Sequence, residues 1–152
     1  MNTQFSIAVL IGLAAAVEDI ARRRISNWIP VSALIAGLLC HGFERGWRGV
    51  LSALGGALGG FLVFLVFYWL GGMGGGDVKL MAGLGSVVGV ERLLAAALWT
   101  AACGGVLAAL CVAAVTLRNA WVRKPAAASR AQHIPYAPAI ALGSWLALLP
   151  KL

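Results

Sequence analysis

Long apolar segments recur along the whole chain with only short polar connectors between them, and they constrain the fold more than any other feature. A helix needs roughly 20 apolar residues to cross a bilayer, so six such helices would use about 120 residues. With 61% hydrophobic and 11% charged residues, the chain has too much apolar surface for a soluble domain of 152 residues. The predicted segments cover about residues 4–21, 28–43, 49–71, 77–90, 92–117 and 134–149.

These segments predict an all-α integral membrane protein, a bundle of about six transmembrane helices. The connectors are short, so we expect residues 1–152 to form a single transmembrane domain without a separate soluble domain. The first segment is not expected to be a cleaved signal peptide, because no Lys or Arg precedes it and the basic residues follow it instead.

Basic residues gather in two connectors that a six-helix topology places on the same side of the membrane. They are Arg22, Arg23 and Arg24 after the first segment, and Arg118, Arg123, Lys124 and Arg130 between the fifth and the sixth. By the positive-inside bias this side is the cytoplasm, so we expect both termini in the periplasm. Topology explains the net charge of +7 better than a nucleic-acid partner does, and we expect no such partner.

Only two aspartates occur in the chain, Asp19 and Asp77, and each lies where an apolar segment meets a polar boundary. The predicted topology brings both to the cytoplasmic side. Carboxylates at the edge of lipid are costly, so the pair indicates an acid site. A simpler interpretation makes Asp19 an ion-pair partner of Arg22 and Arg23, and Asp77 the cap of a helix after a glycine turn.

Glycine is concentrated in two places with different expected roles. In residues 55–60, Gly55 with Gly59 and Gly56 with Gly60 form overlapping GxxxG spacings, which favour close helix packing. The run at residues 71–76 cannot sustain a stable helix. It is either a tight turn or a backbone against which an extended peptide lies beside Asp77.

The fourth segment is short for a membrane span. About 14 residues reach roughly 21 Å, less than a hydrocarbon core of roughly 30 Å. We therefore expect the bilayer to thin locally, so that water reaches Asp77.

Metal ligands and cofactors are not expected. Cys40, Cys103 and Cys111 lie in apolar segments without a CxxC pair, and we interpret them as packing residues. His41 and His133 fall on opposite membrane sides in the predicted topology, which disfavours a joint metal site.

Three motifs now carry a resemblance to the type IV prepilin peptidases. The first is Asp19 followed by Arg22, Arg24, Ile25 and Asn27. The second is the GxGD motif with its trailing lysine, Gly74-x-Gly76-Asp77-x-Lys79. The third is Ile134-Pro135-Tyr136-Ala137-Pro138 followed by Gly143. They follow in the order of that family, and the resemblance covers essentially the whole chain.

The resemblance implies an intramembrane aspartic endopeptidase of the bacterial inner membrane. It would remove the leader peptide of type IV or Flp-type prepilins and pseudopilins at the cytoplasmic face, with membrane lipid as its other partner. Asp19 and Asp77 would be the catalytic dyad that activates water. Gly74, Gly76 and Lys79 would belong to the motif and the substrate groove.

The chain looks most like the minimal peptidases of Flp or Tad pilus systems. Larger bifunctional relatives carry a cytoplasmic insertion with paired cysteines and also methylate the new amino terminus. This chain has no CxxC pair, which puts the methyltransferase activity in doubt. A bifunctional leader peptidase/N-methyltransferase stays open as an alternative.

Amide hydrolysis by two carboxyls needs one ionised group as base and one protonated group as acid, and close like charges enforce that division. Helix ends predict Asp77 as the base and Asp19 as the acid, although Arg22 and Arg23 could reverse this. Lys79 would either reach the headgroups or meet an acidic group of the substrate.

Two other classes stay open. A small proton-coupled transporter also uses intramembrane carboxylates and glycine-broken helices. A non-catalytic assembly factor would use the same bundle only to bind apolar helices.

Overall fold

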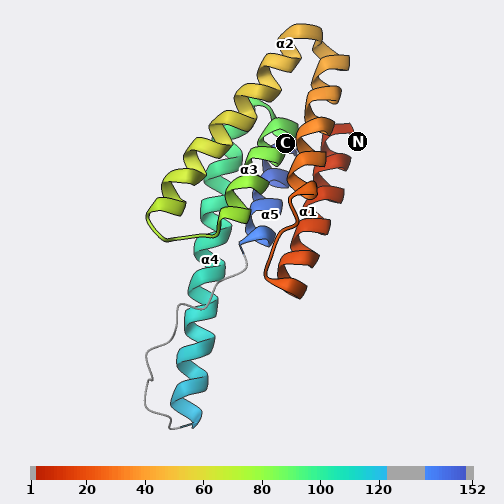
Figure 1. Cartoon of the computed structure of the whole chain (residues 1–152). Helices are drawn as coiled ribbons and strands as arrows, with labels where there is room; N and C mark the ends of the chain where they lie inside the picture. The colour runs from red at the N-terminus through yellow and green to blue at the C-terminus, as the bar shows by residue number, and fades with distance from the viewer. Residues whose placement is uncertain (1–2, 123–135, 150–152) are drawn as a thin grey trace.

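The computed structural model describes residues 3–122 and 136–149, and every regular element in these two ranges is a helix. The helices are α1 (Thr3–Arg22), α2 (Trp28–Trp69), α3 (Gly75–Val88), α4 (Val90–Val122) and α5 (Ala137–Leu148). Figure 1 shows them side by side in one elongated bundle. The prediction of an all-α chain is confirmed over these residues.

Helix α2 is a hairpin with two arms (Figure 1). Its 42 residues are interrupted at Gly46, whose φ of 58° and ψ of −140° belong to a region that essentially only glycine adopts. Next to the bend, a Cβ on Gly49 would overlap the carbonyl oxygen of His41, so the arms touch through their backbones. The predicted segments 28–43 and 49–71 are these two arms.

Counted with both arms of α2, the described residues form six helical segments that alternate in direction along the bundle (Figure 1). The start of α1 and the end of α5 lie at one end, while the end of α1 and the starts of α3 and α5 lie at the other. Within residues 3–122 and 136–149, three helical stretches are long and apolar enough to cross a membrane: Thr3–Arg22, Trp28–Trp69 and Val90–Ala114. Helix α5 is apolar but shorter.

Two helices extend beyond their predicted bounds. Helix α3 starts at Gly75, two residues before the predicted start at 77, because these glycines form the first turn that Asp77 caps. Helix α4 runs past 117 to Val122 and extends beyond the other helices (Figure 1). Part of the predicted basic connector, with Arg123, Lys124 and Arg130, and the motif residues at 134 and 135 lie outside the described residues, as does His133.

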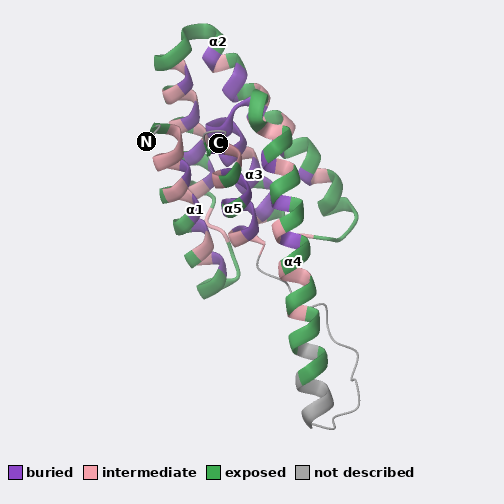
Figure 2. Cartoon of the chain, turned by 180° about the vertical axis from the view of Figure 1, so that it is seen from behind, coloured by how far each residue is buried: buried purple, intermediate pink, exposed green. Residues whose placement is uncertain are grey.

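Helix α3 occupies the centre of the bundle (Figure 2). It is apolar around most of its circumference, as expected of a buried helix, and Leu80, Met81, Leu84 and Val87 are fully buried. With 14 residues it has the predicted short length.

Glycines let α2 approach α3 backbone to backbone from both arms. On the second arm, a Cβ on Gly56 would overlap the carbonyl oxygen of Gly85, and one on Gly60 would lie 2.7 Å from that of Met81. On the first arm, a Cβ on Gly37 would lie 2.6 Å from the Ser86 carbonyl carbon. The close packing predicted for Gly56 and Gly60 is confirmed, because only residues without a side chain fit these contacts.

Large apolar side chains cover the outside of the bundle. They include Leu10, Val17, Phe43, Leu58, Leu94 and Leu110, each more than half exposed. Such a continuous apolar exterior is unfavourable in water and suits lipid. Trp28, Trp47 and Trp69 are also exposed, and they lie at the ends of the α2 arms, where tryptophan favours the membrane interface.

We predict that Gly56→Ala destabilises the protein, whereas Gly105→Ala does not. Both positions are helical, so the change in helix propensity is shared. The new methyl group at 56 would overlap the Gly85 carbonyl oxygen, while a Cβ at 105 meets nothing within 4 Å among the described residues. Overpacking of this kind costs about 1–3 kcal/mol. Thermal unfolding in detergent, followed by tryptophan fluorescence, measures the difference, and equal midpoints would contradict the packing described.

Candidate active site

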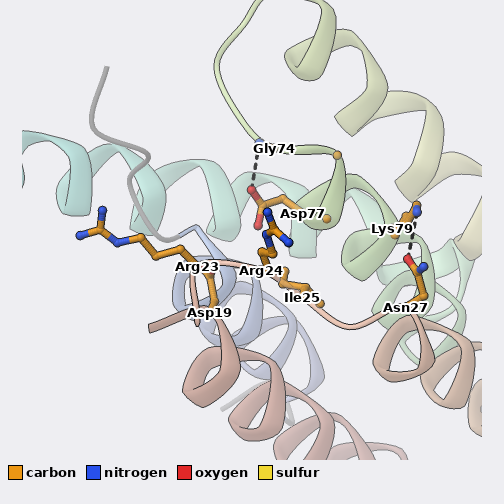
Figure 3. A pocket seen from close by; sticks show the side chains of 10 residues that line it. Asp19, Arg23, Arg24, Ile25, Asn27, Gly74, Asp77 and Lys79 are labelled. Carbon is orange, nitrogen blue, oxygen red and sulfur yellow. Dashed lines mark hydrogen bonds between the residues drawn. The ribbon is translucent and has the colours of Figure 1, made fainter. Parts of the chain in front are cut away.

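A cleft of about 280 Å³ opens at the end of the bundle where α1 ends and α3 begins. Its lining comes from the last turn of α1, the α1–α2 connector, the glycine run and the first turn of α3 (Figure 3). The lining residues are Asp19, Arg23, Arg24, Ile25, Asn27, Gly74, Gly75, Gly76, Asp77 and Lys79. The structure thus brings Asp19, Gly74, Gly76, Asp77 and Lys79, all predicted site residues, into one place.

Asp77 lies in the first turn of α3 and is buried, with 6% of its surface exposed. The backbone N–H of Gly74 donates a hydrogen bond to its Oδ2 at 3.1 Å (Figure 3). The interpretation of Asp77 as a helix cap is therefore confirmed. The same carboxyl faces the cleft, so capping and a role in the site are compatible.

The glycine run is part connector and part helix. Gly71 has a φ of 76°, a left-handed conformation that suits glycine, and it turns the chain after α2. Gly74 is extended, whereas Gly75 and Gly76 already belong to α3. The tight-turn interpretation holds for residues 71–74. Gly74, Gly75 and Gly76 present only backbone along one side of the cleft.

Asp19 lies near the end of α1 and is also buried, with 8% exposed. Its Oδ2 accepts a hydrogen bond of 3.2 Å from the backbone N–H of Ala137, the first residue of α5. The residue before α5, Tyr136, provides no side-chain cap. A carboxyl from a distant helix therefore satisfies one of the donors at the start of α5.

The simpler interpretation of Asp19, as an ion-pair partner of Arg22 and Arg23, is wrong. Arg22 pairs with Glu18 instead, at 3.7 Å, and among the residues described Asp19 has no ion pair. Arg22 and Arg23 are exposed, and the backbone of Arg23 is left-handed, with φ 52°. The chain turns away from α1 at this residue, so Arg22 stays exposed and Arg23 lies at the exposed rim of the cleft, while Asp19 is buried.

Two polar contacts hold the α1–α2 connector over the cleft. Glu18 accepts hydrogen bonds from both the backbone N–H and the hydroxyl of Ser26. Lys79 donates a hydrogen bond to the side-chain oxygen of Asn27 at 2.9 Å (Figure 3). Sequence reasoning placed Lys79 at the headgroups or on the substrate, whereas here it ties α3 to the connector.

Apolar packing also holds the α1–α2 connector against the bundle. Ile25 packs against the core, and a Cβ built on Gly76 would lie 3.4 Å from the Cβ of Ile25. A methyl group at 76 would make an ordinary van der Waals contact with Ile25. Packing against the connector therefore does not by itself explain the second glycine of the GxGD pattern.

Sequence reasoning identified the start of α5 as a motif of the family resemblance but did not predict its contact with Asp19. The available signal was Pro138, which occupies the first turn of α5 as prolines at helix starts do. It marks a helix start, but nothing in the local sequence says that a carboxyl from residue 19 would meet it. Glu18 was also missed as the partner of Ser26.

Both carboxyls now accept a backbone N–H at a helix start and line one cleft. Two buried carboxyls in one water-accessible cleft are the arrangement that general acid–base hydrolysis requires. Asp19 was predicted as the acid because it lies at the end of α1. The start of α5 contacts the same carboxyl with the opposite end of a helix dipole, so helix ends no longer distinguish Asp19 from Asp77. The assignment of acid and base stays a prediction.

Within residues 3–122 and 136–149, no three His, Cys, Asp or Glu side chains gather as metal ligands.

Comparison with known proteins gives a consistent result. Residues 6–109 match the model of the type IV leader peptidase family. The chain is 35% identical over 150 residues to the prepilin leader peptidase/N-methyltransferase of Bacillus subtilis (strain 168), covering 95% of this chain and 55% of that protein. It is 30% identical over 138 residues to the protein of the same name from Aeromonas salmonicida (strain A449), covering 86% of this chain and 43% of that protein.

A more distant similarity reaches an archaeal protein. The preflagellin peptidase of Methanococcus voltae is 29% identical over 87 residues, which cover 55% of this chain and 37% of that protein. The chain spans about half the length of the two bacterial relatives it matches. No solved structure is significantly similar to it.

We predict that Asp19→Asn and Asp77→Asn keep the fold, whereas the alanine variants lose stability. An asparagine oxygen still accepts the N–H of Ala137 or Gly74, and alanine does not. Loss of such a cap costs about 0.5–2 kcal/mol. Unfolding midpoints in detergent test this: each alanine variant should melt below its asparagine counterpart. Equal midpoints for Asp19→Ala and Asp19→Asn would contradict the bond to α5.

Proposed function

This chain belongs to the type IV leader peptidase family, and on that basis we propose that it is an intramembrane aspartic endopeptidase. Its substrates are prepilins and pseudopilins of type IV or Flp type, from which it removes the leader peptide. Membrane lipid surrounds the bundle. The bacterial relatives are also named N-methyltransferases. We propose hydrolysis alone for this chain, because the two carboxyls of the cleft suit acid–base chemistry.

One observation carries the proposal. The only two aspartates of the sequence lie 58 positions apart, and both line the same cleft with their carboxyls held by backbone N–H groups. Helix capping alone does not require the two caps to share a cleft. Hydrolysis by a carboxyl pair does require it.

The reaction follows from this arrangement. The ionised carboxyl takes a proton from a water molecule in the cleft, and the protonated carboxyl donates a hydrogen bond to the oxygen of the scissile peptide bond. Water adds to the carbonyl carbon to form a tetrahedral intermediate. Proton transfer to the leaving nitrogen then breaks the C–N bond. Two neighbouring carboxyls share one proton readily because ionisation of either disfavours ionisation of the other.

The glycine run supports binding of an extended substrate. Gly74 and Gly76 carry no side chains that would block a peptide lying beside Asp77. Lys79 fixes the opposite wall through Asn27, so the cleft keeps its width. Gly74, Gly76 and Lys79 are motif residues of the family resemblance, and we assign them to the substrate groove.

We propose that the six helical segments span the bacterial inner membrane with the cleft facing the cytoplasm and both termini in the periplasm. Arg22, Arg23 and Arg24, at the end of α1 and directly after it, lie at the cleft end, with Lys79 in the cleft wall. At the other end lie Arg45, Arg48 and Arg92, and Arg45 is paired with Glu91 at 2.8 Å. The excess of basic groups at the cleft end favours the cytoplasmic side and suits anionic headgroups there.

Co-expression with prepilin precursors tests the peptidase. We predict that the unmodified chain removes a leader and that Asp19→Asn and Asp77→Asn each abolish removal, because a carboxamide cannot exchange the proton. Glu44→Gln is the matched control, since this exposed carboxyl lies at the bend of α2 and contacts only Gln4 among the hydrogen bonds described. Immunoblots that separate precursor from mature pilin give the result.

Cleavage that persists in both aspartate variants would contradict the dyad. Absence of cleavage by the unmodified chain with every precursor tried would instead favour the transporter or the assembly factor.

Cysteine labelling tests the topology. In a background with Cys40, Cys103 and Cys111 replaced by serine, we expect a membrane-impermeant maleimide to label Trp47→Cys in intact spheroplasts. Arg24→Cys should react only after the membrane is opened, because it lies at the opposite end of the bundle. The reverse pattern would place the cleft in the periplasm.

A further inference from the structure

The α1–α2 connector contacts both of the helices that carry the aspartates. On the α1 side, Glu18 accepts a hydrogen bond from the backbone N–H of Ser26 at 3.0 Å and a second one from its hydroxyl. On the α3 side, Asn27 accepts the hydrogen bond of Lys79 at 2.9 Å (Figure 3). Ser26 and Asn27 are consecutive, so these four residues form one line of polar contacts from α1 to α3, which we call the polar bridge.

The polar bridge begins and ends beside the two carboxyls. Glu18 directly precedes Asp19 near the end of α1, and Lys79 lies two residues after Asp77 near the start of α3. The hydrogen bond of Asp19 to Ala137 reaches α5, and the bond of Asp77 to the glycine run stays at the start of α3, so neither of these bonds joins α1 to α3. The polar bridge does join these two helices, and it therefore bears on the separation of the two carboxyls.

Two residues of the connector are held away from their ordinary preferences. Asn27 is the N-cap residue of α2, where its side chain would normally bond the first turn, yet it makes no capping bond, and its oxygen accepts from Lys79 instead. Arg23 is left-handed, with φ 52°, a conformation that is uncommon for a residue with a side chain and persists where surrounding contacts hold it. The bonds between Glu18 and Ser26 close the turn that contains Arg23.

We propose that Glu18 is a positioning residue for the hydrolysis, which acts through the polar bridge to hold Asp19 and Asp77 at the separation that the reaction needs. This inference rests on the proposed function. A misplacement of about 1 Å can lower a rate by about 100-fold, so a small movement of α1 relative to α3 is enough to reduce turnover.

The bonds to Ser26 and not the ion pair give Glu18 this role. The side chain of Glu18 is only 16% exposed, whereas Arg22, its ion-pair partner at 3.7 Å, is 75% exposed. An ion pair with so exposed a partner contributes little. Removal of Arg22 should therefore leave the connector in place.

Kinetics of the full chain in detergent micelles test the proposal. Glu18→Ala removes both acceptors of Ser26 and should lower kcat for a precursor that the unmodified chain cleaves by about tenfold or more, with KM within about threefold. Glu18→Gln keeps one oxygen acceptor and should retain more of kcat than Glu18→Ala. Arg22→Ala is the matched control, because it leaves both bonds to Ser26, and it should stay within about twofold of the unmodified chain.

A disulfide measures the position of the connector without any substrate. A Cβ on Gly76 would lie 3.4 Å from the Cβ of Ile25, near the separation of about 3.8 Å that a disulfide prefers. In the cysteine-free background, Ile25→Cys with Gly76→Cys should form a disulfide on mild oxidation. Adding Glu18→Ala should slow its formation by about fivefold or more, because the connector no longer stays against α3, whereas adding Arg22→Ala should not.

Cleavage by Glu18→Ala within about twofold of the unmodified chain would overturn the proposal. Loss of cleavage with an unchanged rate of disulfide formation would also overturn it, because Glu18 would then act without the connector. If Glu18→Ala does not fold, Glu18→Gln and Ser26→Ala carry the test, and each should lower kcat and slow the disulfide by a smaller factor. If the unmodified chain cleaves no precursor, the proposed function itself fails, whatever the disulfide shows.

Discussion

Backbone contact between α2 and α3 is the constraint on which the rest of the structure depends. In a bilayer the hydrophobic effect does not drive one helix onto another, so association depends on close packing. Gly37 on one arm and Gly56 and Gly60 on the other let the α2 hairpin enclose the short central helix. The position of α3 then determines where the glycine run and Asp77 emerge. An enclosed helix of 14 residues also places its first turn near one end of the bundle, where water reaches the cleft.

The two aspartates illustrate how one residue serves both fold and site. Each caps a helix start, and each lines the cleft. A cap holds its carboxyl in a fixed orientation, which is the preorganisation that acid–base chemistry needs. The connector contacts through Ser26 and Asn27 then keep the side wall of the cleft in place. The exposed arginines nearby contribute charge to the membrane surface. Arg22 pairs with Glu18, and Asp19 accepts its hydrogen bond from the start of α5.

Much of this organisation could be predicted from the sequence. Apolar runs located all six helical segments, because lipid permits few other structures, and the scarcity of aspartate singled out Asp19 and Asp77. The α2 bend was visible as a gap between two segments, although Gly46 alone does not reveal that helix resumes immediately on both sides. The bond from Ala137 to Asp19 could not be predicted, since it depends on how α5 packs across the bundle. The same holds for Lys79, whose partner Asn27 lies 52 positions away.

The bond between Asp19 and Ala137 joins positions 118 residues apart. During synthesis, Asp19 emerges from the ribosome long before α5 exists. A nascent chain with its first four helices inserted would hold Asp19 without the donor that orients it. The hydrogen bond that orients Asp19 therefore forms only after α5 has been synthesised, so a chain interrupted before α5 would lack it.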